Sequence, residues 1–108
     1  MIIKSTDTEN KEVGPMVIKS YKINPNFSGS LIEIDGDHGK IKCLAEDRIY
    51  FIIEGSGKFI IDNKENEVSK EDLVFVPKNT LYNIIGKMKY FLICSPEFKV
   101  GDDVFLDE

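Results

Sequence analysis

The chain has 108 residues, of which 42% are hydrophobic and 31% are charged, and its formal net charge is −5. This length predicts a single domain, and the composition is that of a folded globular protein. The acidic balance argues against a nucleic-acid partner, because binding to phosphate backbones needs a clustered basic face. No apolar run of about 18 residues is present, so no membrane span is expected.

Short apolar stretches separated by turn residues dominate the chain. They cover residues 15–23, 30–35, 40–44, 48–54, 57–62, 72–76, 80–85 and 88–94. We expect the glycines at 55–57 to form a hairpin and the Asp/Asn residues of 62–66 to form a tight turn. No long segment has a sustained 3.6-residue apolar period, so little or no helix is expected. This pattern predicts an all-β sandwich or barrel.

The stretch "RIYFIIE" is apolar on both faces between its polar ends. One face holds Arg48, Tyr50, Ile52 and Glu54, and the other holds Ile49, Phe51 and Ile53. A strand with one wet face would alternate apolar and polar residues, so both faces of this strand should be covered. Residues 88–94 have the same character. In so small a barrel the second cover is most simply another subunit, and we therefore predict a homodimer.

Two segments resemble the paired motifs of the cupin superfamily, which are small jelly-roll barrels. The first covers residues 36–55 and the second covers residues 71–86. The positions that match the motifs are Gly36, Lys42, Leu44, Arg48 and Gly55, followed by Glu71, Pro77, Asn79, Tyr82 and Gly86. The resemblance implies one cupin domain over residues 1–108, a double-stranded β-helix. Residues 101–108 are either an acidic tail or a segment whose residues 104–106 pack back on the barrel.

Cupin metal sites use three histidines and one glutamate, and the resemblance carries those positions to Lys42, Leu44, Arg48 and Tyr82. Leucine donates nothing, and the two cations repel a divalent ion by about 4 kcal/mol per charge pair at ~4 Å. We therefore predict no metal and no cofactor. The only histidine, His38, lies in the turn "GDHG", where a solvated side chain is expected.

Two registers are possible for residues 40–44. The spacing from Gly36 turns Lys42 into the barrel, whereas the alternation of "KIKCL" turns Ile41 and Cys43 inward. A slip of one residue exchanges the two faces completely. Both registers stay open from the sequence. Glu33 shares a face with Leu31 and is expected to be solvated.

Arg48 and Tyr82 occupy former ligand positions in both registers, with Tyr50 on the same face as Arg48. A guanidinium beside a phenol suits a carboxylate, a phosphate or a polar sugar. Lys42 or Cys43 completes this candidate ligand site, according to the register. The alternative interpretation is structural: Arg48 pairs with Glu46, Asp47 or Glu54, and Tyr82 is a core residue with a wet tip.

Two classes of function follow from these residues. The first is a metal-free cupin that binds a small polar or anionic metabolite inside the barrel. The second is a metal-independent isomerase or epimerase acting on sugars or sugar nucleotides, with Tyr82 as the acid and no evident base. Cys43 and Cys94 fit neither a disulfide framework nor a zinc motif, so we expect reduced thiols in a cytoplasmic protein.

Overall fold

The structure, a computed structural model, describes residues 1–106, so the last two residues of the acidic segment 101–108 lie outside the described part. A short 3-10 turn at Ser5–Asp7 precedes a succession of strands. These are β1 (Asn10–Val13), β2 (Met16–Asn24), β3 (Phe27–Asp37), β4 (Ile41–Cys43), β5 (Asp47–Ile61), β6 (Lys64–Ser69), β7 (Leu73–Val76), β8 (Leu81–Ser95) and β9 (Asp103–Phe105). Within residues 1–106, no helix is long and apolar enough to cross a lipid bilayer.

The hairpin expected at residues 55–57 is not formed, because β5 continues through both glycines. β8 likewise continues through Gly86, where the sequence suggested a break. The two strands pair antiparallel along their whole length, and a bulge lies between Ile52 and Glu54. The bulge moves Glu54 off the face of Arg48 and places it opposite Lys89. Two apolar runs around glycines therefore form one bent strand rather than two strands.

Glycines are required at this bend because the backbones of β5 and β8 nearly touch there. Gly55 has φ +85°, and a β-carbon on it would clash with the carbonyl oxygen of Lys87 and lie 2.7 Å from Cα of Met88. A β-carbon on Gly86 would lie 2.6 Å from Cα of Gly57. Such distances are far below van der Waals contact, so only glycine lets the two strands curl together.

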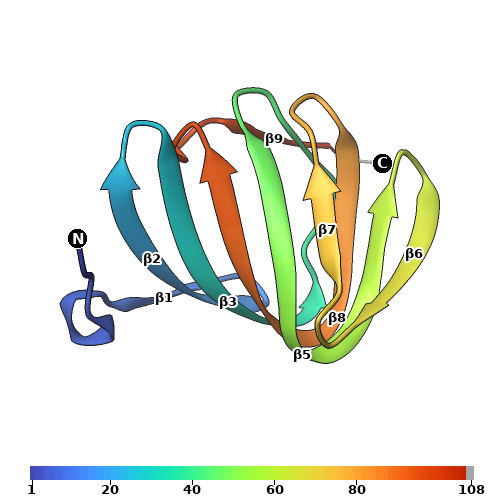
Figure 1. The fold of residues 1–108 in the computed structure, drawn as a ribbon. Coiled ribbons are helices and arrows are strands. Elements are labelled where there is room, and N and C mark those ends of the chain that lie inside the picture. Colours follow the sequence, from blue (N-terminus) through green and yellow to red (C-terminus); the bar gives the residue numbers. More distant parts are fainter. Residues whose placement is uncertain (107–108) are drawn as a thin grey trace.

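The bend divides the sheet into two walls (Figure 1). One wall has the strand order β2–β3–β8–β5–β7, and the other joins β6, β5, β8, β4 and β9. Both ends of β5 and β8 return to the same open end, which we call the mouth, and β9 crosses it (Figure 1). This is the all-β jelly-roll barrel that the motif resemblance implies, and the prediction of its fold class is confirmed.

The turns between strands contain the residue types that favour positive φ, at the positions that the sequence predicted. Asp62 and Asn63 both have positive φ and connect β5 to β6 as a two-residue hairpin, which confirms the predicted tight turn. Asn79 replaces a motif glycine and keeps its left-handed conformation, with φ +67°. Glu71 replaces another such glycine at φ +72° and donates its backbone N–H to the carbonyl of Ile52.

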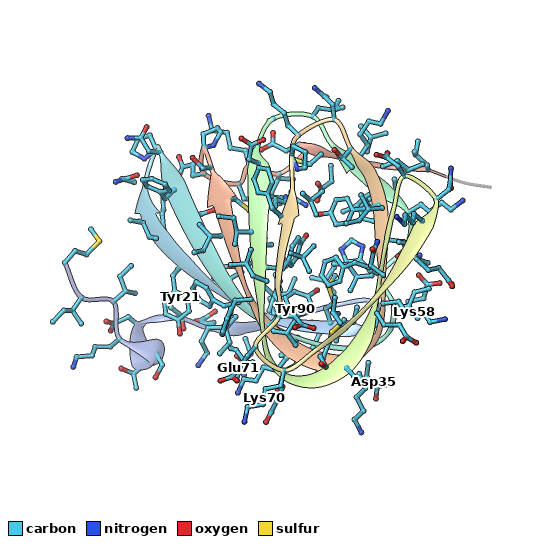
Figure 2. The ribbon with its side chains drawn as sticks, turned by 45° about the vertical axis from the view of Figure 1, so that its right-hand side comes forward. Tyr21, Asp35, Lys58, Lys70, Glu71 and Tyr90 are labelled. Atoms are coloured by element: carbon cyan, nitrogen blue, oxygen red, sulfur yellow. The ribbon has the colours of Figure 1, made fainter. Side chains whose placement is uncertain are left out.

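The core fills the space between the two walls. Ile32, Ile34, Ile52, Ile84 and Met88 form its aliphatic part. Tyr50 lies at its centre, with ring centroids 5.0 Å from Phe59, 5.3 Å from Tyr90 and 6.0 Å from Tyr82. Figure 2 shows Tyr90 within the curled sheet, whereas Asp35 and Lys70 lie at its outer edge. The barrel interior is thus packed with aromatic rings. The buried charged residues Glu46 and Arg48 lie at the mouth instead.

Candidate functional site

Arg48 lies at the start of β5 and points into the mouth, where only 3% of the residue is exposed. Its Nη2 is 2.7 Å from Oε1 of Glu46 and 2.8 Å from Oδ1 of Asp103, and its Nε also donates to Glu46 at 3.2 Å. The ring of Phe98 lies 5.8 Å from the guanidinium carbon. The sequence suggested Glu46, Asp47 or Glu54 as the partner of Arg48, and the structure shows the pair with Glu46. The second partner, Asp103, lies on β9, far along the chain.

A hydrogen-bond chain runs from Arg48 into the core. Nη1 of Arg48 donates to the hydroxyl of Tyr82 at 2.9 Å, and that hydroxyl also bonds to the hydroxyl of Tyr50. Burial raises the pKa of Tyr82 to about 12, although the positive charge of Arg48 lowers it. Burial raises the pKa of Tyr50 well above its usual value. Both phenols are therefore neutral at pH 7, and they can donate protons as well as accept hydrogen bonds.

Two carboxyl groups meet behind the guanidinium. Glu46 is fully buried, and its Oε2 has no donor among the described residues. Burial raises the pKa of Glu46, and a hydrogen bond with Asp102 raises it further, while the same bond lowers the pKa of Asp102. The opposite directions of these two pKa shifts indicate that the carboxyl groups of Glu46 and Asp102 interact. The segment before β9 is thereby linked to the barrel wall.

His38 was expected to be a solvated turn residue, and that prediction is wrong. Its ring is partly buried and stacks on Phe105, with centroids 6.1 Å apart. Its Nδ1 lies 3.1 Å from the carbonyl oxygen of Gly39, and burial lowers the pKa of the ring, while the charges of Asp103 and Arg48 also act on it. A neutral ring that donates through Nδ1 leaves Nε2 as an acceptor. Local sequence pattern could not predict this contact, because Phe105 reaches His38 from β9, which lies far along the chain.

The structure decides the register of β4. Ile41 and Cys43 are buried, whereas Lys42 between them is half-exposed. Of the two registers that the sequence left open, the one that turns Lys42 inward is therefore wrong, and Lys42 lies outside the group formed by Arg48, Tyr50 and Tyr82. Burial raises the pKa of the Cys43 thiol, so the thiol is protonated at pH 7. The positive charge of Arg48 acts in the opposite direction and lowers this pKa. Alternation along the strand was a better guide than spacing from the glycine.

The residues at the mouth do not fit a metal ion. Arg48 occupies a position at which the motif has glutamate, and its charge is already balanced by two carboxylates. Leu44, at another ligand position, is half-exposed and has no donor atom. Among residues 1–106, no group of three or more His, Cys, Asp or Glu side chains is arranged to hold an ion.

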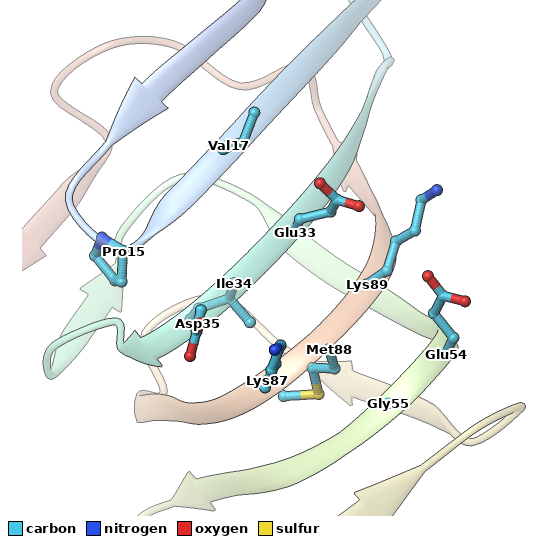
Figure 3. A pocket seen from close by; sticks show the side chains of 10 residues that line it. All are labelled: Pro15, Val17, Glu33, Ile34, Asp35, Glu54, Gly55, Lys87, Met88 and Lys89. Atoms are coloured by element: carbon cyan, nitrogen blue, oxygen red, sulfur yellow. The ribbon is translucent and has the colours of Figure 1, made fainter.

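A groove of about 530 Å³ lies away from the mouth, where β2, β3, β5 and β8 curve beneath Pro15 (Figure 3). Glu33 and Asp35 on β3 lie opposite Lys89 and Lys87 on β8. Glu33 is exposed there, as the alternation of its strand predicted. Opposite charges on solvated, neighbouring strands are ordinary surface chemistry. The groove lacks buried polar groups of the kind found at the mouth, and the mouth is therefore the candidate site.

Alkaline pH should unfold the protein through its buried phenols and thiol. Tyr82 has a folded pKa of about 12 against an ordinary 10.0, and Cys94 has about 12 against 9.0. These pKa values are higher in the folded state than in the unfolded state. The free energy of unfolding is therefore at its full value below the unfolded-state pKa values of 9.0 and 10.0, and it falls as pH rises towards 12. Urea unfolding from pH 8 to pH 12 measures the fall. In Tyr82→Phe the fall between pH 10 and pH 12 should be smaller by about 2 kcal/mol. An equal fall in both proteins would contradict this assignment.

The curled sheet and its position-by-position motif match define the class of protein: the chain has the cupin fold. Solved structures agree. Streptomyces Pac13, a nucleoside dehydratase, superposes with a TM-score of 0.91 at 18% identity in a structure with uridine, covering 98% of this chain and 89% of Pac13. KdgF from Halomonas superposes with a TM-score of 0.83 at 13% identity, covering 92% of this chain and 96% of KdgF. At these identities the likeness concerns the fold alone.

A sequence relative is the uncharacterized protein MJ1618 of Methanocaldococcus jannaschii. It is 34% identical over 55 residues, which are 49% of this chain and 44% of the relative. The match therefore spans less than half of the relative's length. No family model matches the chain.

Proposed function

We propose that this chain is a metal-free, small-molecule-binding cupin that holds a polar or anionic metabolite at the mouth of the barrel. One observation carries the proposal: a buried guanidinium, paired with Glu46, is joined through hydrogen bonds to the two buried phenols of Tyr82 and Tyr50. Buried ionic groups rarely stabilise a fold more than apolar side chains of the same size would. Their presence at the mouth of the barrel supports a role in binding.

The ligand would contact Arg48 from the side now covered by Asp103. That carboxylate lies 2.8 Å from Nη2, and 19% of its side chain is exposed. It takes the place that a carboxylate or phosphate of a ligand would take on a guanidinium fork. When Tyr50 donates to Tyr82, the Tyr82 hydroxyl accepts two hydrogen bonds and keeps its own proton for a ligand oxygen.

The proposal is tested by thermal unfolding with uridine, uridine monophosphate, glucuronate and inorganic phosphate as probes. Uridine is included because Pac13 has been observed with it in variants that replace a tyrosine or a histidine. A probe at a hundredfold excess over its Kd should stabilise the chain by about 2.7 kcal/mol. Tyr82→Phe should weaken binding at least about tenfold by removing one hydrogen bond to the ligand.

Asp103→Asn separates anionic from neutral ligands. Removing the resident carboxylate should tighten binding of an anionic probe about tenfold and leave a neutral nucleoside nearly unchanged. Asp35→Asn, on the outer face, is the matched control and should change neither. If no probe at ~10 mM stabilises either the wild-type chain or Asp103→Asn, the proposed site is wrong.

A second candidate, an acid–base isomerase, is favoured by the position of His38. The sequence indicated no base for this reaction. In the structure the neutral imidazole of His38 lies near Asp103 and Arg48, whose charges both act on its pKa. His38 would take a proton from the carbon beside a sugar carbonyl, and Tyr82 would protonate the carbonyl oxygen. His38 then delivers its proton to the former carbonyl carbon, and the Tyr82 phenolate takes the proton of the neighbouring hydroxyl, which becomes the new carbonyl; this completes an isomerisation without a cofactor.

This candidate predicts that solvent deuterium enters a sugar substrate and that His38→Asn abolishes the exchange while binding persists. Absence of exchange across a panel of sugars and sugar nucleotides would remove the enzyme and leave the binding protein. A cytoplasmic location belongs to the same proposal and is supported by the two free, buried thiols.

A further inference from the structure

The outer surface of the wall β2–β3–β8–β5–β7 carries a continuous apolar surface, which we call the apolar face. Its central residues are Ile49, Phe51, Leu73, Phe75, Phe91 and Ile93. They come from the three neighbouring strands β5, β7 and β8, which lie side by side in Figure 1. Their alternate neighbours, such as Tyr50 and Val76, point into the core.

Cross-strand pairing arranges the apolar face in two straight rows. In one row, Ile49 lies opposite Phe75 on one side and Ile93 on the other. In the second, Phe51 lies between Leu73 and Phe91 in the same way. Side chains in directly opposite positions of adjacent strands are in contact range, so each row is a ridge without gaps.

A glycine extends the apolar face onto β3. The ring of Phe91 covers Gly29, and a β-carbon there would lie 2.8 Å from the Cζ atom of Phe91. Tyr21, opposite Gly29 on β2, has its ring centroid 6.1 Å from that of Phe91. The aromatic rings thus lie across the sheet on this side, which gives a broad, low surface rather than isolated projecting side chains.

The apolar face is large enough to form the centre of an interface. Phe51 is 42% exposed, Phe75 54% and Leu73 63%. With about 200 Å² for each large apolar residue, the exposed residues of the two rows present on the order of 500 Å². Monomers seldom leave so much contiguous apolar surface in water. A specific interface of standard size buries about 800 Å² per partner, which this surface and a polar rim would supply.

We propose that the apolar face is covered by a second copy of this chain, in a two-fold dimer that packs sheet against sheet. A two-fold interface brings the same surface of both copies together, and two rows of apolar side chains without a charge are self-complementary. The rim carries both signs, with Asp47 at one end and Lys89 towards the other. A mixed rim suits a second copy, whereas an anionic lipid surface would be repelled by a chain of net charge −5.

Sedimentation velocity tests the proposal on the full chain. Wild-type protein at about 10 µM should sediment as a dimer, at twice the 12.3 kDa of one chain. Phe51→Asp with Phe75→Asp places two charges in the rows, and this variant should sediment as a monomer over the same range. Val13→Asp is the matched control, because Val13 is also exposed but lies on β1, outside the apolar face; it should remain a dimer.

Thermal unfolding provides a second measurement that does not depend on the variant. The Tm of a dimer rises with protein concentration, whereas that of a monomer does not. A wild-type chain that sediments at 12.3 kDa at 100 µM, with a concentration-independent Tm, overturns the proposal and leaves the apolar face to another protein or a lipid surface. If the double variant Phe51→Asp with Phe75→Asp is folded and still dimeric, the interface lies elsewhere and the proposal is also wrong.

Discussion

Arg48→Met is expected to lower the free energy of unfolding by about 3–5 kcal/mol at pH 8, because it leaves a buried carboxylate without its cation. Glu46 is fully buried and receives two hydrogen bonds from the guanidinium. Once those bonds are lost, the other side chains that act on Glu46 are the carboxyl of Asp102 and the thiol of Cys94, and neither supplies a positive charge. Urea unfolding followed by circular dichroism measures the loss.

The loss should depend on pH with a definite sign. Burial already raises the pKa of Glu46, and Arg48 opposes that rise more than Cys94 does, so removing Arg48 raises that pKa further. A raised folded pKa means that stability is present below the ordinary value of 4.5 and falls as pH rises through the folded pKa. The variant should therefore lose less stability, relative to wild type, at pH 5 than at pH 8.

Two further variants make the interpretation specific. Arg48→Met combined with Glu46→Leu should recover much of the loss, because a buried pair replaced by apolar groups costs little. Lys58→Met breaks an ion pair with Glu65 that is exposed and 3.5 Å long, and it should change stability by no more than about 0.5 kcal/mol. A loss below about 1 kcal/mol for Arg48→Met, or no recovery in the double variant, would show that the buried pair is not the source.

Local pattern was sufficient to predict an all-β barrel and the inward side of β5, and the motif resemblance implied the jelly roll. Alternation along β5 placed Arg48 and Tyr50 together, and the match to the second motif added Tyr82 from β8; the structure joins all three by hydrogen bonds. The reason is physical: a two-residue period in a strand fixes which face each side chain takes, whatever the strand pairs with.

Contacts between distant segments were beyond the reach of local pattern. Asp103 and Phe105 reach the mouth because β9 pairs with β4. Packing of residues 104–106 on the barrel was one of two alternatives from the sequence, but neither short strand identified its partner. The burial of His38 and the balanced charge of Arg48 both follow from the pairing of β9 with β4. The glycines of β5 were interpreted as a hairpin for a related reason. A bend within a strand and a turn between strands both favour glycine, and only the packing of β8 against Gly55 and Gly57 distinguishes them.

The bend gives the second large effect: Gly55→Ala is expected to lower the free energy of unfolding by about 3–5 kcal/mol. Its φ of +85° is a conformation that costs an L-residue roughly 1–2 kcal/mol. The new methyl would also meet the Lys87 carbonyl and the Met88 backbone, and forcing a packed site open adds about 1–3 kcal/mol. Neither neighbour can rotate away, since both are backbone atoms of the paired strand.

Gly14→Ala separates the two contributions. Gly14 also has positive φ, +56°, but a β-carbon there would meet nothing within 4 Å. That variant should therefore lose only the conformational cost, about 1–2 kcal/mol, when both are measured by urea unfolding at pH 7. Because β5 and β8 bring Arg48 and Tyr82 together only if they bend, Gly55→Ala should also weaken ligand binding at the mouth, and Gly14→Ala should not. Equal losses of stability in the two variants would mean that the strands do not approach as closely at Gly55 as the bend requires.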